Sequence, residues 1–277
     1  MRKVRKESIR CDFSTKQYKN LIFRDSLVSS CIVPKAKING IILEPKHDQQ
    51  MRLKLLACEI FYREISSLTA NLPHRVDVEF LPQQLHVIGR VRMKDRLTEY
   101  LAAIDENCYD AILLAYGLCS GGIAGLTAGK IPLVVPRAHD CITLFLGCRK
   151  KYQDYFFANG GTYFMTIGWF EQDNALNYGI EMMPFYNKLA FIETGIEPDN
   201  TFERRAQKLA EERHWEFEKL TGDLTLLRRL LNGDWNEDFL IVPPGQQIQT
   251  AYNDEVIESI APHNKNSNVF PLKTDDP

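Results

Sequence analysis

Two stretches decide the expected fold: Tyr109-Asp-Ala-Ile-Leu-Leu-Ala-Tyr-Gly-Leu-Cys-Ser-Gly-Gly122 and Pro132-Leu-Val-Val-Pro-Arg-Ala-His-Asp-Cys141. Each contains an apolar run typical of a buried strand, followed by a loop that carries cysteine or histidine. The first loop supplies Cys119, and the second supplies His139 and Cys141. Open α/β sheets bind ligands where their strands end, so these loops mark the expected functional site.

Strands and helices alternate upstream of these stretches. Expected strands cover residues 53–57 and 76–80, expected helices cover 59–70 and 94–104, and a loop over 82–89 contains His86. This order predicts the α/β class, with a Rossmann-like parallel sheet, flanking helices and one or two lobes. Carboxyl ends of parallel strands share one edge, so Cys58 is expected near Cys119 and Cys141 although it lies far from them in sequence.

The chain divides into four expected regions. They are an N-terminal extension (1–50), an α/β lobe carrying the Cys/His loops (51–160), a second α/β lobe or continuation of the sheet (161–250), and a polar tail (251–277). Further helices are expected over 123–129, within 174–190, and over 202–220, where the pattern is strongly charged and amphipathic.

Composition narrows the class of function. The 277 residues are 44% hydrophobic and carry a net charge of −2, which gives no field to recruit nucleic acid or an anionic membrane. No apolar run has membrane-spanning length, and the basic N-terminus lacks a secretory core, so we expect a cytoplasmic protein. Seven cysteines form an odd set, which favours metal binding or thiol chemistry over a disulfide framework.

The thiols and the imidazole together suggest a metal site. Zinc prefers cysteine and histidine ligands in tetrahedral geometry, and we expect Cys58, Cys119, His139 and Cys141 to provide them. Iron or an iron–sulfur cluster is the alternative cofactor. In an extended segment, His139 and Cys141 would face the same side. Two other interpretations stay open: separate buried cysteines, or a metal-free site with Cys119 as nucleophile and His139 as its base.

Other side chains near these loops have expected roles. Glu64, after Cys58, could orient a ligand or act as a general base, or it could be a solvated helix charge. Arg137 could bind an anionic substrate group, or pair with Asp140. Trp169 could wall a substrate pocket, or belong to the core.

At these residues the chain resembles a family of prokaryotic proteins described as domain of unknown function 1638. The resemblance covers roughly residues 50–250 and rests on Leu56-Ala-Cys-Glu59, Leu114-Ala-Tyr-Gly-Leu-Cys-Ser120, Val135-Pro-Arg-Ala-His-Asp-Cys-Ile142, Gly161-Thr-Tyr163, Gly168-Trp169, Thr221-Gly-Asp-Leu224 and Val242-Pro-Pro-Gly245. The chain has Cys148 where the family often has serine, which argues against Cys148 as a ligand. The resemblance implies no established activity, and it suggests an association with corrinoid-dependent methyl transfer.

Three functions follow as hypotheses. The first is a zinc- or iron-dependent transferase or hydrolase that activates a thiol or water, linked to methyl transfer and a corrinoid protein. The second is a non-catalytic metal- or cluster-binding module that serves a partner enzyme. The third is a metal-free thiol enzyme that uses Cys119 and His139 on a small-molecule substrate.

Overall fold

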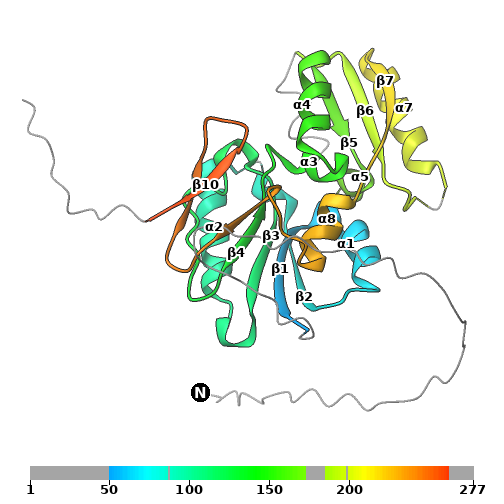
Figure 1. Ribbon diagram of the computed structural model, residues 1–277. Helices are drawn as coiled ribbons and strands as arrows, with labels where there is room; N and C mark the ends of the chain where they lie inside the picture. Colours follow the sequence, from blue (N-terminus) through cyan, green and yellow to red (C-terminus); the bar gives the residue numbers. More distant parts are fainter. Residues whose placement is uncertain (1–49, 87, 173–184, 198, 262–277) are drawn as a thin grey trace, which may run out of the picture.

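The largest sheet is mostly parallel, as the sequence predicts. The computed structural model describes residues 50–86, 88–172, 185–197 and 199–261. The sheet has the strand order β2-β1-β3-β4-β8, and only β8 runs antiparallel to its neighbour (Figure 1). Its strands are β1 (Arg52–Cys58), β2 (Arg75–Leu81), β3 (Ala111–Ala115), β4 (Leu133–Pro136) and β8 (Phe239–Val242). The predicted α/β class is therefore confirmed.

Both faces of this sheet are covered, which explains its apolar strands. Every residue of β3 and β4 is buried, as expected for central strands of a parallel sheet between helices. The covering elements include α1 (Tyr62–Thr69), α2 (Arg90–Ala102) and α8 (Thr225–Asn232). Helix α8 contacts β3, β4 and α1, and it buries the leucines of its apolar face.

A second, smaller parallel sheet has the order β5-β6-β7 and forms the other body of the fold in Figure 1. It comprises β5 (Thr162–Met165), β6 (Lys188–Glu193) and β7 (Glu216–Thr221), accompanied by α4 (Arg149–Ala158), α5 (Ile167–Glu171) and α7 (Thr201–Arg213). The chain then returns through α8 to β8 in the first sheet. The interval 161–250 thus contributes strands to both the five-stranded and the three-stranded sheet.

The expected helix over 202–220 is wrong in its second half. Helix α7 ends at Arg213, and His214 adopts a left-handed conformation with φ of 57°. The following residues place Phe217 and Leu220 among charged side chains and pair with β6. Strand pairing with β6 therefore prevails over the helical pattern of charges.

The expected helix over 123–129 is also wrong. This segment is a turn, with φ of 89° at Gly125, and its backbone pairs with the hairpin that follows β8. The amide of Gly125 donates to the carbonyl of Ile248, and the amide of Ile248 donates to the carbonyl of Leu126. These hydrogen bonds to a segment distant in sequence take the place of the hydrogen bonds within a helix.

The last described strands form a hairpin of β9 (Gln247–Thr250) and β10 (Ile257–Ile260). Residues 257–260 of the expected polar tail are therefore a strand. The expected extension (1–50) lies almost entirely outside the described residues, as do most of the expected helices of 174–190. Within the described ranges, no helix combines the length and apolar character needed to cross a membrane.

Candidate metal centre

Four neighbouring parallel strands deliver thiol or imidazole side chains to one edge of the first sheet. Cys58 is the last residue of β1, and His86 ends η2 (Gln83–His86), the 3-10 turn after β2. Cys119 begins η4 (Cys119–Gly121) after β3, and Cys141 begins α3 (Cys141–Leu146) after β4. The topology thus gathers residues that lie far apart in the sequence.

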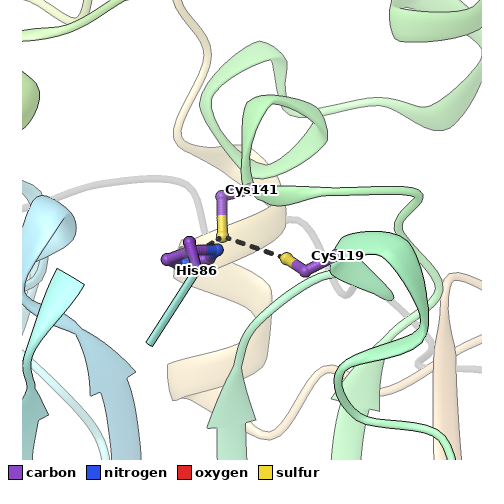
Figure 2. Close-up of side chains that lie close together, drawn as sticks. All are labelled: His86, Cys119 and Cys141. Carbon is purple, nitrogen blue, oxygen red and sulfur yellow. Dashed lines mark hydrogen bonds between the residues drawn. The ribbon is translucent and has the colours of Figure 1, made fainter. Parts of the chain in front are cut away.

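Three of these side chains form a compact cluster. The ligand atoms of His86, Cys119 and Cys141 all lie within 4.8 Å of one another, and Figure 2 shows the three side chains converging. The two sulfur atoms are 3.6 Å apart, and Sγ of Cys141 lies 3.8 Å from Nε2 of His86. Cys141 is buried, whereas Cys119 and His86 are partly exposed.

These separations suit a single tetrahedral ion. A zinc ion with bonds of about 2.3 Å to sulfur and about 2.0 Å to nitrogen separates two sulfurs by about 3.8 Å, and sulfur from nitrogen by about 3.5 Å. The observed 3.6 and 3.8 Å differ from these values by only tenths of an ångström. Two thiols and an imidazole are also donors that zinc and iron accept, so the residues fit the expected cofactor.

The cluster holds its protons unevenly when no ion is bound. A hydrogen bond from the Cys141 thiol and the charge of His86 lower the pKa of Cys119 to about 6, against the effect of burial. The same hydrogen bond, together with burial, raises the pKa of Cys141 well above its usual range. Burial lowers the pKa of His86, but its interactions with the Cys119 and Cys58 thiols prevail and raise it to about 10. These directions favour a thiolate on Cys119, a protonated ring on His86 and a neutral thiol on Cys141.

The loops that carry the two cysteines are tied together by their backbones. The amide of Leu118 donates to the carbonyl of Ala138 (2.8 Å), and the amide of Cys119 donates to the carbonyl of His139 (3.0 Å). Gly117 permits this approach, because a Cβ there would lie 2.5 Å from the Cα of Asp140. Glycine at this position is thus required for the Cys119–Cys141 distance.

The Cys119 turn also holds an unusual backbone. Cys119 and Ser120 have φ of 47° and 57°, in the left-handed region that residues with a side chain rarely adopt. Such conformations cluster at functional sites, where the surrounding structure maintains them. Here the turn presents the Cys119 sulfur to Cys141.

Asp140 fixes the start of α3 and hence the position of Cys141. Its carboxylate accepts hydrogen bonds from the amides of Ile142 (2.9 Å) and Thr143 (3.3 Å), which caps the helix. The hydroxyl of Tyr152 donates to the other carboxylate oxygen at 2.7 Å. Asp140 thus connects the cysteine-bearing helix to α4.

We expect Asp140→Ala to lower the free energy of unfolding by about 2 kcal/mol, because it removes the cap and leaves the Tyr152 hydroxyl without its acceptor. Asp140→Asn, which keeps an acceptor oxygen, is the matched control and is expected to lose about half as much. Urea denaturation of the three proteins measures both differences. Equal losses in the two variants would show that the cap is not the source of the stabilisation.

Cys58 lies beside the cluster but is not among the three mutually close ligands. Its side chain is completely buried at the end of β1. Its thiol contributes to the raised pKa values of both His86 and Tyr116. Cys58 could therefore become a fourth ligand or remain a buried neighbour of His86.

Two aromatic side chains hold His86. The ring of Tyr116 stacks on it with centroids 5.7 Å apart, and the ring of Trp169 meets it edge-on at 6.1 Å. The hydroxyl of Tyr116 is buried and has no hydrogen-bond partner among the described residues. Trp169 comes from α5 in the second body, so the environment of His86 depends on both sheets.

Close packing of α5 against η1 (Glu59–Phe61) positions Trp169. A Cβ on Gly168 would lie 1.9 Å from the carbonyl oxygen of Ile60, so only glycine fits at that contact. The Arg63 guanidinium also binds the Glu171 carboxylate, with Nε at 2.9 Å and 3.0 Å from the two oxygens. These contacts join the second body to the turn that follows Cys58.

The imidazole of His139 does not lie in the cluster. Its Nε2 is 3.0 Å from Nε2 of Gln153, and its ring stacks on Tyr152 at 5.8 Å. Burial and the charge of Arg149 lower the pKa of His139, which favours a neutral ring that accepts the Gln153 amide proton. Among the described residues, no contact joins the His139 ring to a thiol. The predicted role of His139 as ligand or base therefore has no support from the geometry.

The guanidinium of Arg137 is engaged by the β9–β10 hairpin. Its Nη1 lies 2.8 Å from the Glu255 carboxylate and 3.2 Å from the carbonyl oxygen of that residue, and it also donates to the carbonyl of Ile257. The predicted alternative, pairing with Asp140, is not the arrangement found. An anionic substrate would have to displace Glu255 to reach this guanidinium.

Glu64 is buried on α1 and faces the second body. Its Oε1 accepts a hydrogen bond from the Thr194 hydroxyl at 3.0 Å, and its Oε2 has no partner among the described residues. Burial is the largest influence on the carboxyl and raises its pKa. The carboxyl is therefore not a solvated helix charge, and it lies outside the group of three ligands.

The raised pKa of Glu64 implies a stability that depends on pH. The unfolded carboxyl has a pKa of about 4.3, so stability falls as the pH rises from there through the higher folded value, because the unfolded state ionises first. We expect Glu64→Gln to be no less stable than the parent at pH 8 and to lose this part of the pH dependence. Chemical denaturation at pH 4, 6 and 8 measures it, and parallel curves for both proteins would contradict the assignment.

No local sequence pattern indicates a role for His86. Its loop carries no spacing typical of a metal ligand, and His139 lies closer to the cysteines in the chain. The usable signal is topological: His86 follows β2, which pairs with β1, and thus reaches the same sheet edge as Cys58. A histidine in the loop after any strand of a parallel sheet is a candidate on that ground, and β2 is the edge strand of this sheet.

The fold and the cluster define an α/β protein with a Cys/His site at the carboxyl edge of a mostly parallel sheet. The family model for "Protein of unknown function (DUF1638)" matches residues 80–231, more than half of the chain. The chain belongs to this family, as its sequence motifs suggested. The matched interval contains His86, Cys119 and Cys141 and begins after Cys58. No curated protein and no solved structure matches the chain.

Proposed function

We propose that the chain is a metalloprotein in which His86, Cys119 and Cys141 hold one zinc or iron ion for catalysis. The observation that carries this proposal is the spacing of the three ligand atoms, 3.6 Å between the sulfurs and 3.8 Å from sulfur to nitrogen. These separations approximate the edges of one tetrahedron of ligands around an ion. Zinc is the first candidate because it takes this donor set without redox chemistry.

Three ligands favour an enzyme over a structural site. Catalytic zinc sites have three protein ligands and one open position, whereas structural sites have four. Partial exposure of Cys119 and His86 supports access from solvent to that position. When bound, the ion would lower the pKa of a water molecule or of a substrate thiol.

The surrounding residues have defined tasks under this proposal. Tyr116 and Trp169 orient the His86 ring, and Asp140 places Cys141 at the first turn of α3. The Tyr116 hydroxyl, buried near the thiols, is available to donate a hydrogen bond to a sulfur or to a bound substrate. The reaction class is therefore thiol or water activation, by a transferase or a hydrolase.

A narrower version makes the activated thiol the acceptor of a methyl group, with a corrinoid protein as donor. Only the family resemblance supports this version. It predicts a shift of the corrinoid absorption spectrum when a methylated corrinoid protein, the zinc-loaded chain and a small thiol are mixed. An unchanged spectrum would remove this version and leave the metal site unaffected.

The first test is metal binding by the purified, reduced protein. Titration with zinc against a chromogenic chelator is expected to give about one ion per chain. A reduced, folded protein that binds no zinc or iron would exclude the proposal. It would favour metal-free thiol chemistry, for which the lowered pKa of Cys119 is the supporting observation.

Cys58 decides between an open and a closed site. With three ligands, Cys58→Ser should keep the stoichiometry and weaken zinc affinity by less than about tenfold. A loss as large as that of Cys119→Ser would make Cys58 the fourth ligand. That result would favour the alternative function, a closed metal- or cluster-binding module that serves a partner enzyme.

A further inference from the structure

We propose that Cys119 and Cys141 are a site of reversible oxidation by hydroperoxides, at which they form a disulfide that excludes the metal ion. The formation of the disulfide concerns the cysteines alone. The exclusion of metal rests on the proposed function, so the two parts are tested separately.

Geometry already brings the two thiols into contact. Their sulfur atoms are 3.6 Å apart, and a disulfide requires about 2.05 Å, so the sulfurs must approach each other by about 1.5 Å. The loops that carry them are held together by the backbone hydrogen bonds from Leu118 to Ala138 and from Cys119 to His139. The fold therefore already brings together the two cysteines, which are 22 positions apart in sequence, before any disulfide forms.

The two cysteines differ in access, which assigns their order of reaction. Cys119 is partly exposed on a turn, whereas Cys141 is only 3% exposed. The Cys119 thiolate attacks one oxygen of the hydroperoxide, the O–O bond breaks, and the products are a sulfenic acid and an alkoxide or hydroxide ion. The Cys141 thiol then attacks the Cys119 sulfur, and water leaves with the sulfenic oxygen and the thiol proton. Two thiols are oxidised and one peroxide is reduced.

Two exposed cysteines outside the cluster, Cys108 and Cys148, have to be separated from the reacting pair in the assay. Both side chains are exposed, and neither belongs to the cluster of His86, Cys119 and Cys141. Trypsin would leave Cys108 with Cys119 in fragment 97–130, and Cys148 with Cys141 in fragment 138–149. A Cys108→Ser/Cys148→Ser baseline protein removes this ambiguity, because each fragment then contains one cysteine.

The first experiment uses this baseline protein, freed of metal with a chelator and treated with one equivalent of hydrogen peroxide. We expect the intact mass to fall by two hydrogen atoms and the two fragments to appear covalently linked until a phosphine reductant separates them. With Cys141→Ser added, a sulfenic acid should persist on Cys119 and be trapped by dimedone. Linkage of Cys119 to fragment 55–63, which contains Cys58, or direct oxidation to sulfonic acid, would overturn the proposal.

The second experiment tests the exclusion of metal. Saturating zinc should slow disulfide formation about tenfold or more, because one ion bound by both sulfurs holds them about 3.8 Å apart as ligands. The oxidised baseline protein should bind no zinc until it is reduced. A disulfide in a chain that never binds metal would support the first part and contradict the proposed function. Zinc bound with unchanged stoichiometry by the oxidised protein would overturn the exclusion.

Discussion

Replacement of Cys119 or Cys141 by serine is expected to weaken zinc binding on the order of 100- to 1000-fold, which is roughly one ligand's share of the binding free energy of a zinc site. His86→Ala should have a comparable effect, because its Nε2 lies 3.8 Å from the Cys141 sulfur, within the same cluster. Competition against a chelator of known zinc affinity measures each loss. Circular dichroism of the metal-free proteins verifies that they remain folded.

His139→Ala is the matched control for His86→Ala. His139 is close in sequence to Cys141, but its ring contacts Gln153 and Tyr152 instead of the thiols. Its replacement should change zinc affinity by less than about tenfold. If His139→Ala loses the metal and His86→Ala keeps it, the ligand set that the sequence suggested is right and the cluster described above is not the binding site.

Gly117→Ala is expected to lower the free energy of unfolding by about 3 kcal/mol, because the new methyl group meets backbone atoms that cannot turn aside. A Cβ at this position would lie 2.5 Å from the Cα and carbonyl carbon of Asp140. The clash pushes apart the two loops that carry Cys119 and Cys141. We therefore also expect weaker zinc binding in Gly117→Ala, measured in the same competition assay.

Gly160→Ala is the control for this prediction. Nothing lies within 4 Å of the Cβ that it would introduce, and Gly160 is not at positive φ. Its free energy of unfolding should stay within about 0.5 kcal/mol of the parent. Equal stability of Gly117→Ala and Gly160→Ala would mean that the two loops are not in close contact.

The central strands were predictable because their own residues are apolar, as burial between two layers of helices requires. Strand β3 is apolar throughout, and every residue in it is buried between helices. Strand β7 was not predictable in the same way. Its Phe217 alternates with Glu216 and Glu218, and it continues a charged helix; only its pairing with β6 defines it as a strand.

The candidate site was predictable where topology alone determines it. Cys119 and Cys141 follow adjacent strands β3 and β4, so their loops had to meet at one edge. His139 was expected beside Cys141 because residues two apart share a face in an extended segment. Asp140 instead caps α3, so Cys141 is already helical; its sulfur contacts Cys119, whereas the His139 ring contacts Gln153. His86 depends on the pairing of β2 with β1, which no local pattern encodes.

X-ray absorption at the zinc edge measures the ligands of the bound ion. For the zinc-loaded protein, we expect two sulfur neighbours at about 2.3 Å and one imidazole nitrogen at about 2.0 Å, with a light atom in the remaining position. His86→Ala should remove the imidazole scattering pattern, and His139→Ala should leave it intact. A first shell of oxygen and nitrogen without sulfur, or an imidazole signal that disappears with His139 instead of His86, would contradict the assignment of the site.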